Sequence, residues 1–190
     1  MVAGKVNTFV WLRARQATAL RDLSRRNAAA EAAWLHSQRE LNKVHPDEPT
    51  PEPIRLEAFQ LRPHTWPRES HLVETAMRKR LAASDLSGPW APFTASEREA
   101  QRLAGRRSGT PNEGFDDKLA LDLAPEVVDL ARLASHRISE PIVNQLRAEN
   151  LIGPGASRSR QARARREELQ AQIYTLGRIA REAIALVVGP

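Results

Sequence analysis

Few residues of this chain combine the side-chain types and spacing that catalysis or metal binding requires. No two histidines stand at the spacing of a zinc-binding helix motif; they are His36, His45, His64, His71 and His136. The segment from Gly105 to Gly109 matches neither a nucleophile elbow nor a phosphate-binding loop. The pair Asp116 and Asp117 is more typical of a helix start than of a metal site. Cysteine is absent, which excludes disulfides and thiolate ligands. The sequence therefore predicts a protein that is not an enzyme and has no cofactor and no metal.

Arginine is the side chain with the strongest functional signal. The 190 residues have a net charge of +6, and 25 arginines stand against four lysines. Segments 1–44 and 158–190 are basic, whereas 111–157 is acidic. Either the two basic ends hold a polyanion, or the acidic segment packs against them within the chain. Because guanidinium groups bind phosphate in bidentate fashion, we expect a set of arginines to contact nucleic acid. These are Arg13, Arg15, Arg25, Arg26, Arg106, Arg107, Arg158, Arg160, Arg163, Arg165 and Arg166.

Aromatic residues make up only 5% of the chain, so each one is notable. Trp66 and Trp90 lie in proline-rich segments, where an indole either attaches the segment to a partner or stacks on bases. Attachment is the commoner role. We therefore expect protein partners to be anchored by Phe9, Trp11, Trp34, Trp66, Trp90 and Phe93.

The apolar pattern predicts an all-α fold, with long helices at both ends, shorter helices between them, and extended Pro/Trp-rich connections. A heptad pattern from Val6 to Val44 makes 1–44 one long, basic, amphipathic helix. Prolines predict an extended linker over 45–67. The remainder, 68–190, should be helical, with an acidic helix hairpin at 116–152 and a basic helix at 157–188. Within it, Pro67 opens a helix to about Ser84, and Thr94 with Glu97 forms a capping box.

The end of the predicted hairpin resembles the end of the recognition helix in bacterial winged-helix regulators. The resemblance lies in the run Leu146-Arg147-Ala148-Glu149-Asn150-Leu151-Ile152, with Asn150 in the left-handed position that usually takes glycine. It implies that Asn144, Gln145 and Arg147 face a DNA major groove. The charge opposes this implication, because Glu140 and Glu149 outweigh Arg147 where a groove helix should attract phosphate.

These features favour a non-enzymatic helical accessory subunit of a large assembly. A ribonucleoprotein such as an organellar or bacterial ribosome is the first choice, with RNA on the arginine-rich ends and protein subunits on the amphipathic helices. The alternatives are a winged-helix or helix-turn-helix DNA-binding regulator, and a phage or organelle scaffold subunit without nucleic acid. No apolar run is long enough for a membrane span. We expect an intracellular, reducing compartment, either the mitochondrial matrix or a bacterial cytoplasm.

Overall fold

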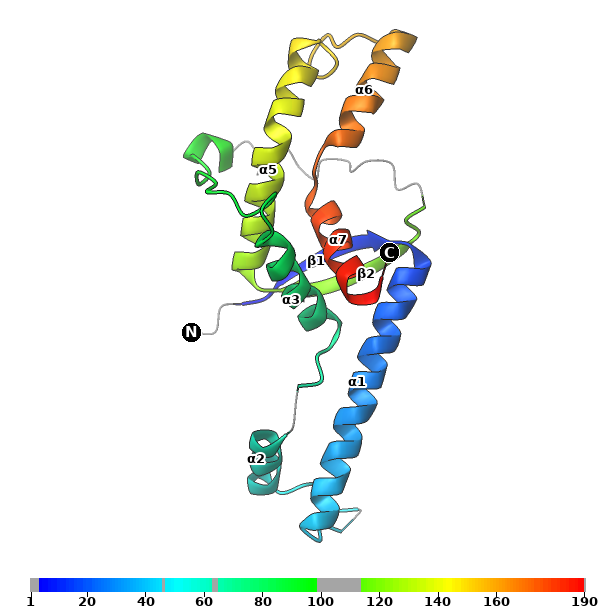
Figure 1. The fold of residues 1–190 in the computed structure, drawn as a ribbon, viewed down its shortest axis with the longest axis vertical. Helices are drawn as coiled ribbons and strands as arrows, with labels where there is room; N and C mark the ends of the chain where they lie inside the picture. Colours follow the sequence, from blue (N-terminus) through cyan, green and yellow to red (C-terminus); the bar gives the residue numbers. More distant parts are fainter. Residues whose placement is uncertain (1–3, 46, 63–64, 99–113, 190) are drawn as a thin grey trace.

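The chain is mostly helical, as predicted, but it contains one small two-stranded sheet. A computed structural model describes residues 4–45, 47–62, 65–98 and 114–189. A central body holds the sheet, and two helical arms leave it in opposite directions (Figure 1). The α1–α2 arm comprises residues 28–61, and the α5–α6 arm comprises residues 140–172. None of the helices in the described ranges is long and apolar enough to cross a membrane.

The sheet is an antiparallel ribbon of β1 (Val6–Leu12) and β2 (Asp117–Leu123), with Val6 opposite Leu123 and Leu12 opposite Asp117. Side chains alternate along both strands. One face is buried and consists of Val10, Leu12, Leu119, Leu121 and Leu123. The other face is exposed and consists of Asn7, Phe9, Trp11, Lys118, Ala120 and Asp122.

The predicted helix over 1–44 is therefore wrong at its beginning. Residues 6–12 alternate β-branched and aromatic side chains, which suit a pleated, half-buried strand. The heptad places Val6 and Phe9 on one face, whereas the strand puts them on opposite faces. Helix α1 (Ala14–Leu41) begins only after Arg13, and its first N–H, at Ala14, donates to the carboxylate of Asp116 at 3.1 Å. The sequence predicted a helix start at Asp116 and Asp117 themselves; a strand begins there instead, and Asp116 contacts the first turn of the distant helix α1.

The core lies between the ribbon, the first turns of α1, which contribute Ala17 and Leu20, and the helices α3 (Glu69–Leu81), α5 (Pro125–Ala148) and α7 (Leu176–Val188). Helices α3 and α7 cross the ribbon in Figure 1. Helix α3 falls within the predicted range 67–84. Small side chains let these helices approach closely, and buried alanines occur in all four of them. With so few aromatic residues, aliphatic packing forms this core.

The predicted hairpin at 116–152 is also wrong. Its first part is β2, and its remainder is one continuous helix, α5, with Pro141 inside. The sequence predicts that Pro141 opens a new helix, because proline removes one backbone hydrogen bond. The helix continues instead because its buried stripe extends across the proline, from Ala131 and Ala134 to Val143 and Leu146. The helix that turns back on α5 is α6 (Arg160–Gln172).

The predicted helix at 157–188 is broken into α6 and α7, with Tyr174 between them. The hydroxyls of Ser135 and Ser139 donate to the Tyr174 carbonyl at 2.6 and 3.0 Å, and the Tyr174 N–H donates to Ser139 at 2.9 Å. These bonds satisfy the backbone where the helix is interrupted. Thr175 then caps α7 by accepting from the Arg178 N–H.

The predicted extended linker at 45–67 contains a helix, α2 (Glu52–Leu61). Pro53 lies in its first turn, where the missing N–H has no intrahelical partner to lose. The capping box is confirmed, because Thr94 accepts from the Glu97 N–H at 3.2 Å and Glu97 accepts from the Thr94 N–H at 2.7 Å.

Candidate nucleic-acid interface

Most acidic groups of the central body are already paired with cations of the same chain. Arg21 binds Asp117 through two hydrogen bonds of 2.6 and 2.8 Å. Arg78 bridges Glu74 and Glu126, and Arg80 reaches Asp85, Glu182 and the Tyr174 hydroxyl. Of these pairs, Arg21–Asp117 joins a basic end to the acidic segment, as the intrachain alternative expects, whereas Arg78–Glu126 joins that segment to the middle of the chain. These arginines lie outside the predicted nucleic-acid-binding set.

Within the predicted set, only two arginines form ion pairs in the described part of the chain. Arg25 pairs with Asp22, and Arg165 pairs with Glu149 and Glu168. The Glu149 hydrogen bond is the main reason that the pKa of Arg165 is raised. Arg106 and Arg107 lie outside the described residues. The arginines with no carboxylate partner among the described residues are Arg13, Arg15, Arg26, Arg158, Arg160, Arg163 and Arg166.

Arg158, Arg160 and Arg163 lie at the start of α6, at the free end of the α5–α6 arm, and Arg166 follows in its middle (Figure 1). Ser159 caps α6 by accepting from the Ala162 N–H at 3.0 Å. The first turn contains no acidic residue, and Arg158, Arg160 and Arg163 are exposed there. Positive charge at a helix N-terminus opposes the helix dipole. These arginines thus lie where an anion would be favourable, and no carboxylate of the described part of the arm neutralises them.

A small apolar cluster and a tight turn hold α6 in place. Asn150 adopts φ 53°, which confirms the predicted left-handed position. The Leu151 N–H donates to the Leu146 carbonyl at 2.8 Å, and the Asn150 N–H donates to the Arg147 carbonyl, which together form a Schellman motif. Leu146, Leu151 and Leu169 are buried against one another.

The exposed face of the ribbon brings aromatic rings and cations together. Phe9 and Trp11 are 40% and 39% exposed. The Lys118 ammonium lies 3.9 Å from the Phe9 ring centre. Arg181 and Arg13 lie 4.2 and 6.0 Å from the ring centre of Phe115. The sequence did not predict roles for Lys118, Phe115 or Arg181. The alternation of residues 117–123 is a signal for a strand with Lys118 on its exposed face, but it does not show that this strand pairs with residues 6–12.

The other four predicted anchors pack within the chain and are half-buried. Trp34 and Trp66 lie 6.5 Å apart between ring centres, and Phe93 contacts the ring of His136 at 5.2 Å. Trp90 folds back on the core and donates to the Leu86 carbonyl at 2.9 Å. Gly88, with φ 40°, permits this fold, because a Cβ there would lie 2.6 Å from the indole. Of the six anchors, Phe9 and Trp11 are the exposed ones.

Glu97, His136 and Glu140 offer three ligand atoms within 4.8 Å of one another. Arg137 already occupies this cluster, because its guanidinium donates to both Glu97 oxygens at 2.6 and 3.1 Å. That hydrogen bond is the main reason that the pKa of Glu97 falls to about 2. Arg137 also donates to the carbonyls of Ala91 and Pro92. The cluster therefore fits an ion-pair network that holds segment 91–97 against α5 better than it fits a metal centre.

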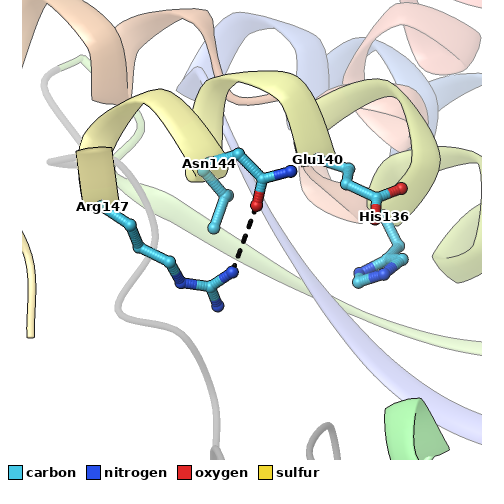
Figure 2. A pocket seen from close by; sticks show the side chains of 5 residues that line it. His136, Glu140, Asn144 and Arg147 are labelled. Carbon is cyan, nitrogen blue, oxygen red and sulfur yellow. Dashed lines mark hydrogen bonds between the residues drawn. The ribbon is translucent and has the colours of Figure 1, made fainter. Parts of the chain in front are cut away.

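Figure 2 shows Asn144 and Arg147, two of the three side chains implied by the winged-helix resemblance. Asn144 and Arg147 border a shallow hollow together with His136 and Glu140, and Arg147 donates to Asn144 at 3.3 Å. Gln145 donates to Glu149 at 2.7 Å. These residues belong to the second half of one continuous helix, so the two-helix unit that would insert into a groove is not formed here.

Comparison of the chain with protein-family models, with curated proteins and with solved structures finds no match.

Proposed function

We propose that the protein is a non-enzymatic accessory subunit of a large ribonucleoprotein, which binds the RNA backbone through the end of its α5–α6 arm. The observation that carries this proposal is the group Arg158, Arg160, Arg163 and Arg166, which has no carboxylate partner among the described residues. A ribosome of the mitochondrial matrix or of a bacterial cytoplasm is the assembly that suits it best.

Phosphate is the ligand that these arginines fit. A phosphate group would remove the repulsion among them and their unfavourable interaction with the α6 dipole. The contact is to the backbone rather than to bases, because the arm presents no recognition helix in the described residues. A backbone contact without base readout suits a subunit that recognises the position of an RNA within an assembly.

The α1–α2 arm supports the assembly part of the proposal. It exposes large apolar side chains at its far end: Leu41 (74% exposed), Leu56 (55%), Phe59 (60%) and Leu61 (60%). Exposed apolar side chains mark a protein–protein contact where they form a contiguous patch. We propose that a protein neighbour covers them.

The test is the salt dependence of RNA binding. Changing Arg158, Arg160 and Arg163 to Ser should weaken binding and reduce the slope of log K against log salt by about 0.7–0.9 for each arginine–phosphate pair that is removed. A matched control removes the same charge elsewhere, through Arg55→Ser, Lys79→Ser and Arg132→Ser. The control should retain the slope. An identical slope in the wild type and the α6 variant would contradict the proposal.

A second measurement addresses the assembly. The mass of the native particle in an extract should fall when RNase is added. A particle mass that RNase leaves unchanged would favour the scaffold alternative, in which no nucleic acid takes part.

A further inference from the structure

The exposed face of the β1–β2 ribbon combines features that the α6 arginines lack. It presents two exposed aromatic rings on one strand and a lysine on the other, and it ends beside an aromatic ring that two arginines approach. We propose that this face binds a single-stranded segment of nucleic acid, whose bases stack on Phe9 and Trp11 and whose phosphates contact Lys118 and Arg13. This inference rests on the proposed function in that its ligand is nucleic acid, but it concerns a different surface.

The register of the strands makes the two rings accessible. Phe9 lies opposite Ala120, whose side chain is small, and Phe9 is 40% exposed although Lys118 lies over its ring. Trp11 lies opposite Lys118, and the Lys118 ammonium leans back over Phe9. A cation is thereby held between the two aromatic positions. Base stacking on an aromatic ring with a neighbouring cation for phosphate is the usual arrangement in single-strand binding sites.

The spacing of the rings selects an unpaired strand. Residues two apart on a strand lie about 7 Å apart, which is about twice the 3.4 Å rise between stacked bases in a duplex. Neighbouring bases can contact both rings only when they are pulled apart. Single strands permit this at low cost, whereas a duplex would have to be opened.

The cations of this face lie at the end of the ribbon that holds Trp11. At that end Asp117 is paired with Arg21 and Asp116 accepts from the α1 backbone, whereas the carboxylate of Asp122, which accepts from Asn7, lies toward the other end. Arg181 is half-buried and forms no ion pair in the described part of the chain. Its neighbour Glu182 is taken by Arg80 and Arg178.

Burial, together with Arg178, lowers the pKa of Arg181. A guanidinium that is partly desolvated and lacks an acidic partner among the described residues is stabilised by an added anion. A phosphate near Arg13 and Arg181 would supply that anion. The end of the face that holds Lys118 and Arg13 therefore complements the phosphates of a nucleic-acid strand.

The test separates stacking from charge. Phe9→Leu combined with Trp11→Leu removes the ring faces but keeps apolar side chains and the net charge. The probes are a 12-nucleotide oligouridylate and an RNA duplex of equal length. The double variant should bind the single strand at least tenfold more weakly and the duplex within twofold of wild type. The single variant Trp11→Phe retains an aromatic ring at this position and should therefore keep most of the wild-type affinity for the single strand.

A second readout is tryptophan fluorescence. Oligouridylate should quench the wild type, and Trp11→Phe should lose that quenching, because Trp34, Trp66 and Trp90 pack within the chain. Circular dichroism of the variants confirms that the fold is retained. Each variant is measured beside the α6 triple Ser variant.

The outcomes distinguish the two proposals. If the aromatic variant binds the single strand as wild type does while the α6 variant loses its salt slope, the ribbon inference is wrong and the proposed function stands. If only the aromatic variant loses affinity, the ribbon binds and the α6 contact is wrong. If the wild type binds neither probe, both proposals are wrong. A ribbon that binds only a protein strand along its edge would also overturn the inference.

Discussion

The two arms of the molecule share a backbone design but differ in the side chains that complete it. Each long helix ends in a Schellman motif with a left-handed residue that is not glycine, Lys43 with φ 54° after α1 and Asn150 with φ 53° after α5. A shorter helix then follows in each arm, α2 or α6. The backbone alone therefore does not determine what the arm does.

The side chains around each turn make the difference. After α5, Leu151 is buried against Leu146, which is the apolar contact that usually accompanies this motif. After α1, the corresponding pair is Val44 and Arg39, and Ala58 is the buried residue of α2. The α5–α6 arm thus closes its own apolar cluster and presents arginines. The α1–α2 arm has leucines and a phenylalanine that are exposed to solvent.

This difference suggests a division of labour. An arm that is complete without a partner can hold charges at a fixed position, as binding to phosphate requires. An arm with uncovered apolar side chains gains stability when a protein neighbour covers them. The three predictions below test this contrast, beginning with the largest expected effect.

Truncating the apolar cluster of the α5–α6 arm should have the largest effect. Leu146→Ala should destabilise the packing of α6 on α5 by about 2–5 kcal/mol, because Leu146 is almost completely buried and the arm has few other apolar contacts. Hydrogen exchange of the α6 backbone amides measures this local opening.

The matched control is Leu56→Ala in the α1–α2 arm. Leu56 is 55% exposed, so we expect a change within about 0.5 kcal/mol. Equal effects of the two substitutions would mean that the arms do not differ in packing, and the contrast would fail.

Glu74→Gln tests the central body from which both arms extend. Glu74 binds Lys5, Arg78 and the Ala124 N–H, and so connects β1, α3 and the start of α5. Burial alone would raise the pKa of Glu74, but these three partners outweigh it and lower the pKa to about 2. We expect Glu74→Gln to lower the free energy of unfolding by about 2–3 kcal/mol at pH 7. Protection of the α6 amides against local opening should change little.

The pH dependence of this effect has a definite sign. A carboxyl whose pKa is lowered on folding stabilises the protein above its unfolded pKa, and that contribution is lost as the pH falls through the folded value. The difference in the free energy of unfolding between the wild type and Glu74→Gln should therefore have its full size above about pH 4.5 and become smaller as the pH falls toward 2. Urea unfolding at several pH values measures it, with the exposed Glu57→Gln as control. A difference that is constant with pH would disprove the ion-pair explanation.

The sequence was informative where side-chain pattern and local chemistry agree. Helix α3, the Thr94–Glu97 capping box and the left-handed Asn150 were all predicted from neighbouring residues. The two strands were not, because each is stabilised by a partner more than 100 residues away. For β1 the heptad pattern fitted the same residues as well, whereas the alternation of β2 was present in the sequence and was overlooked. The break at Tyr174 depends on hydrogen bonds from α5, and residues near Tyr174 in the sequence do not indicate these bonds.

The candidate site also has one part that could be predicted from the sequence and one part that could not. The exposed α6 arginines could be identified from composition, since a run of arginines without acids is visible in the sequence. The ribbon face could not, because Phe9 and Lys118 become neighbours only through strand pairing. The packing of Trp66 and Trp90 within the chain likewise follows from tertiary contacts rather than from their proline-rich surroundings.

The smallest effect concerns the two left-handed turns. A residue with a Cβ loses about 1–2 kcal/mol in the left-handed region, and asparagine tolerates that region better than lysine. Glycine relieves this cost but loses more entropy on folding. Lys43→Gly should therefore stabilise the end of α1 by about 0.5–1 kcal/mol. Asn150→Gly should change the stability of the end of α5 by only about a few tenths of a kcal/mol. Amide exchange in the last turn of each helix measures both.

The two substitutions control for each other, because the backbone angles at Lys43 and Asn150 differ by 1° in φ. The Asn150 side chain also donates to the Gly155 carbonyl at 3.4 Å, a weak bond that glycine would remove. The gain at Lys43 should therefore exceed the gain at Asn150. If Lys43→Gly instead loosens the end of α1, the lysine stabilises the turn through its side chain. The two arms would then differ in how their turns are held as well as in what covers them.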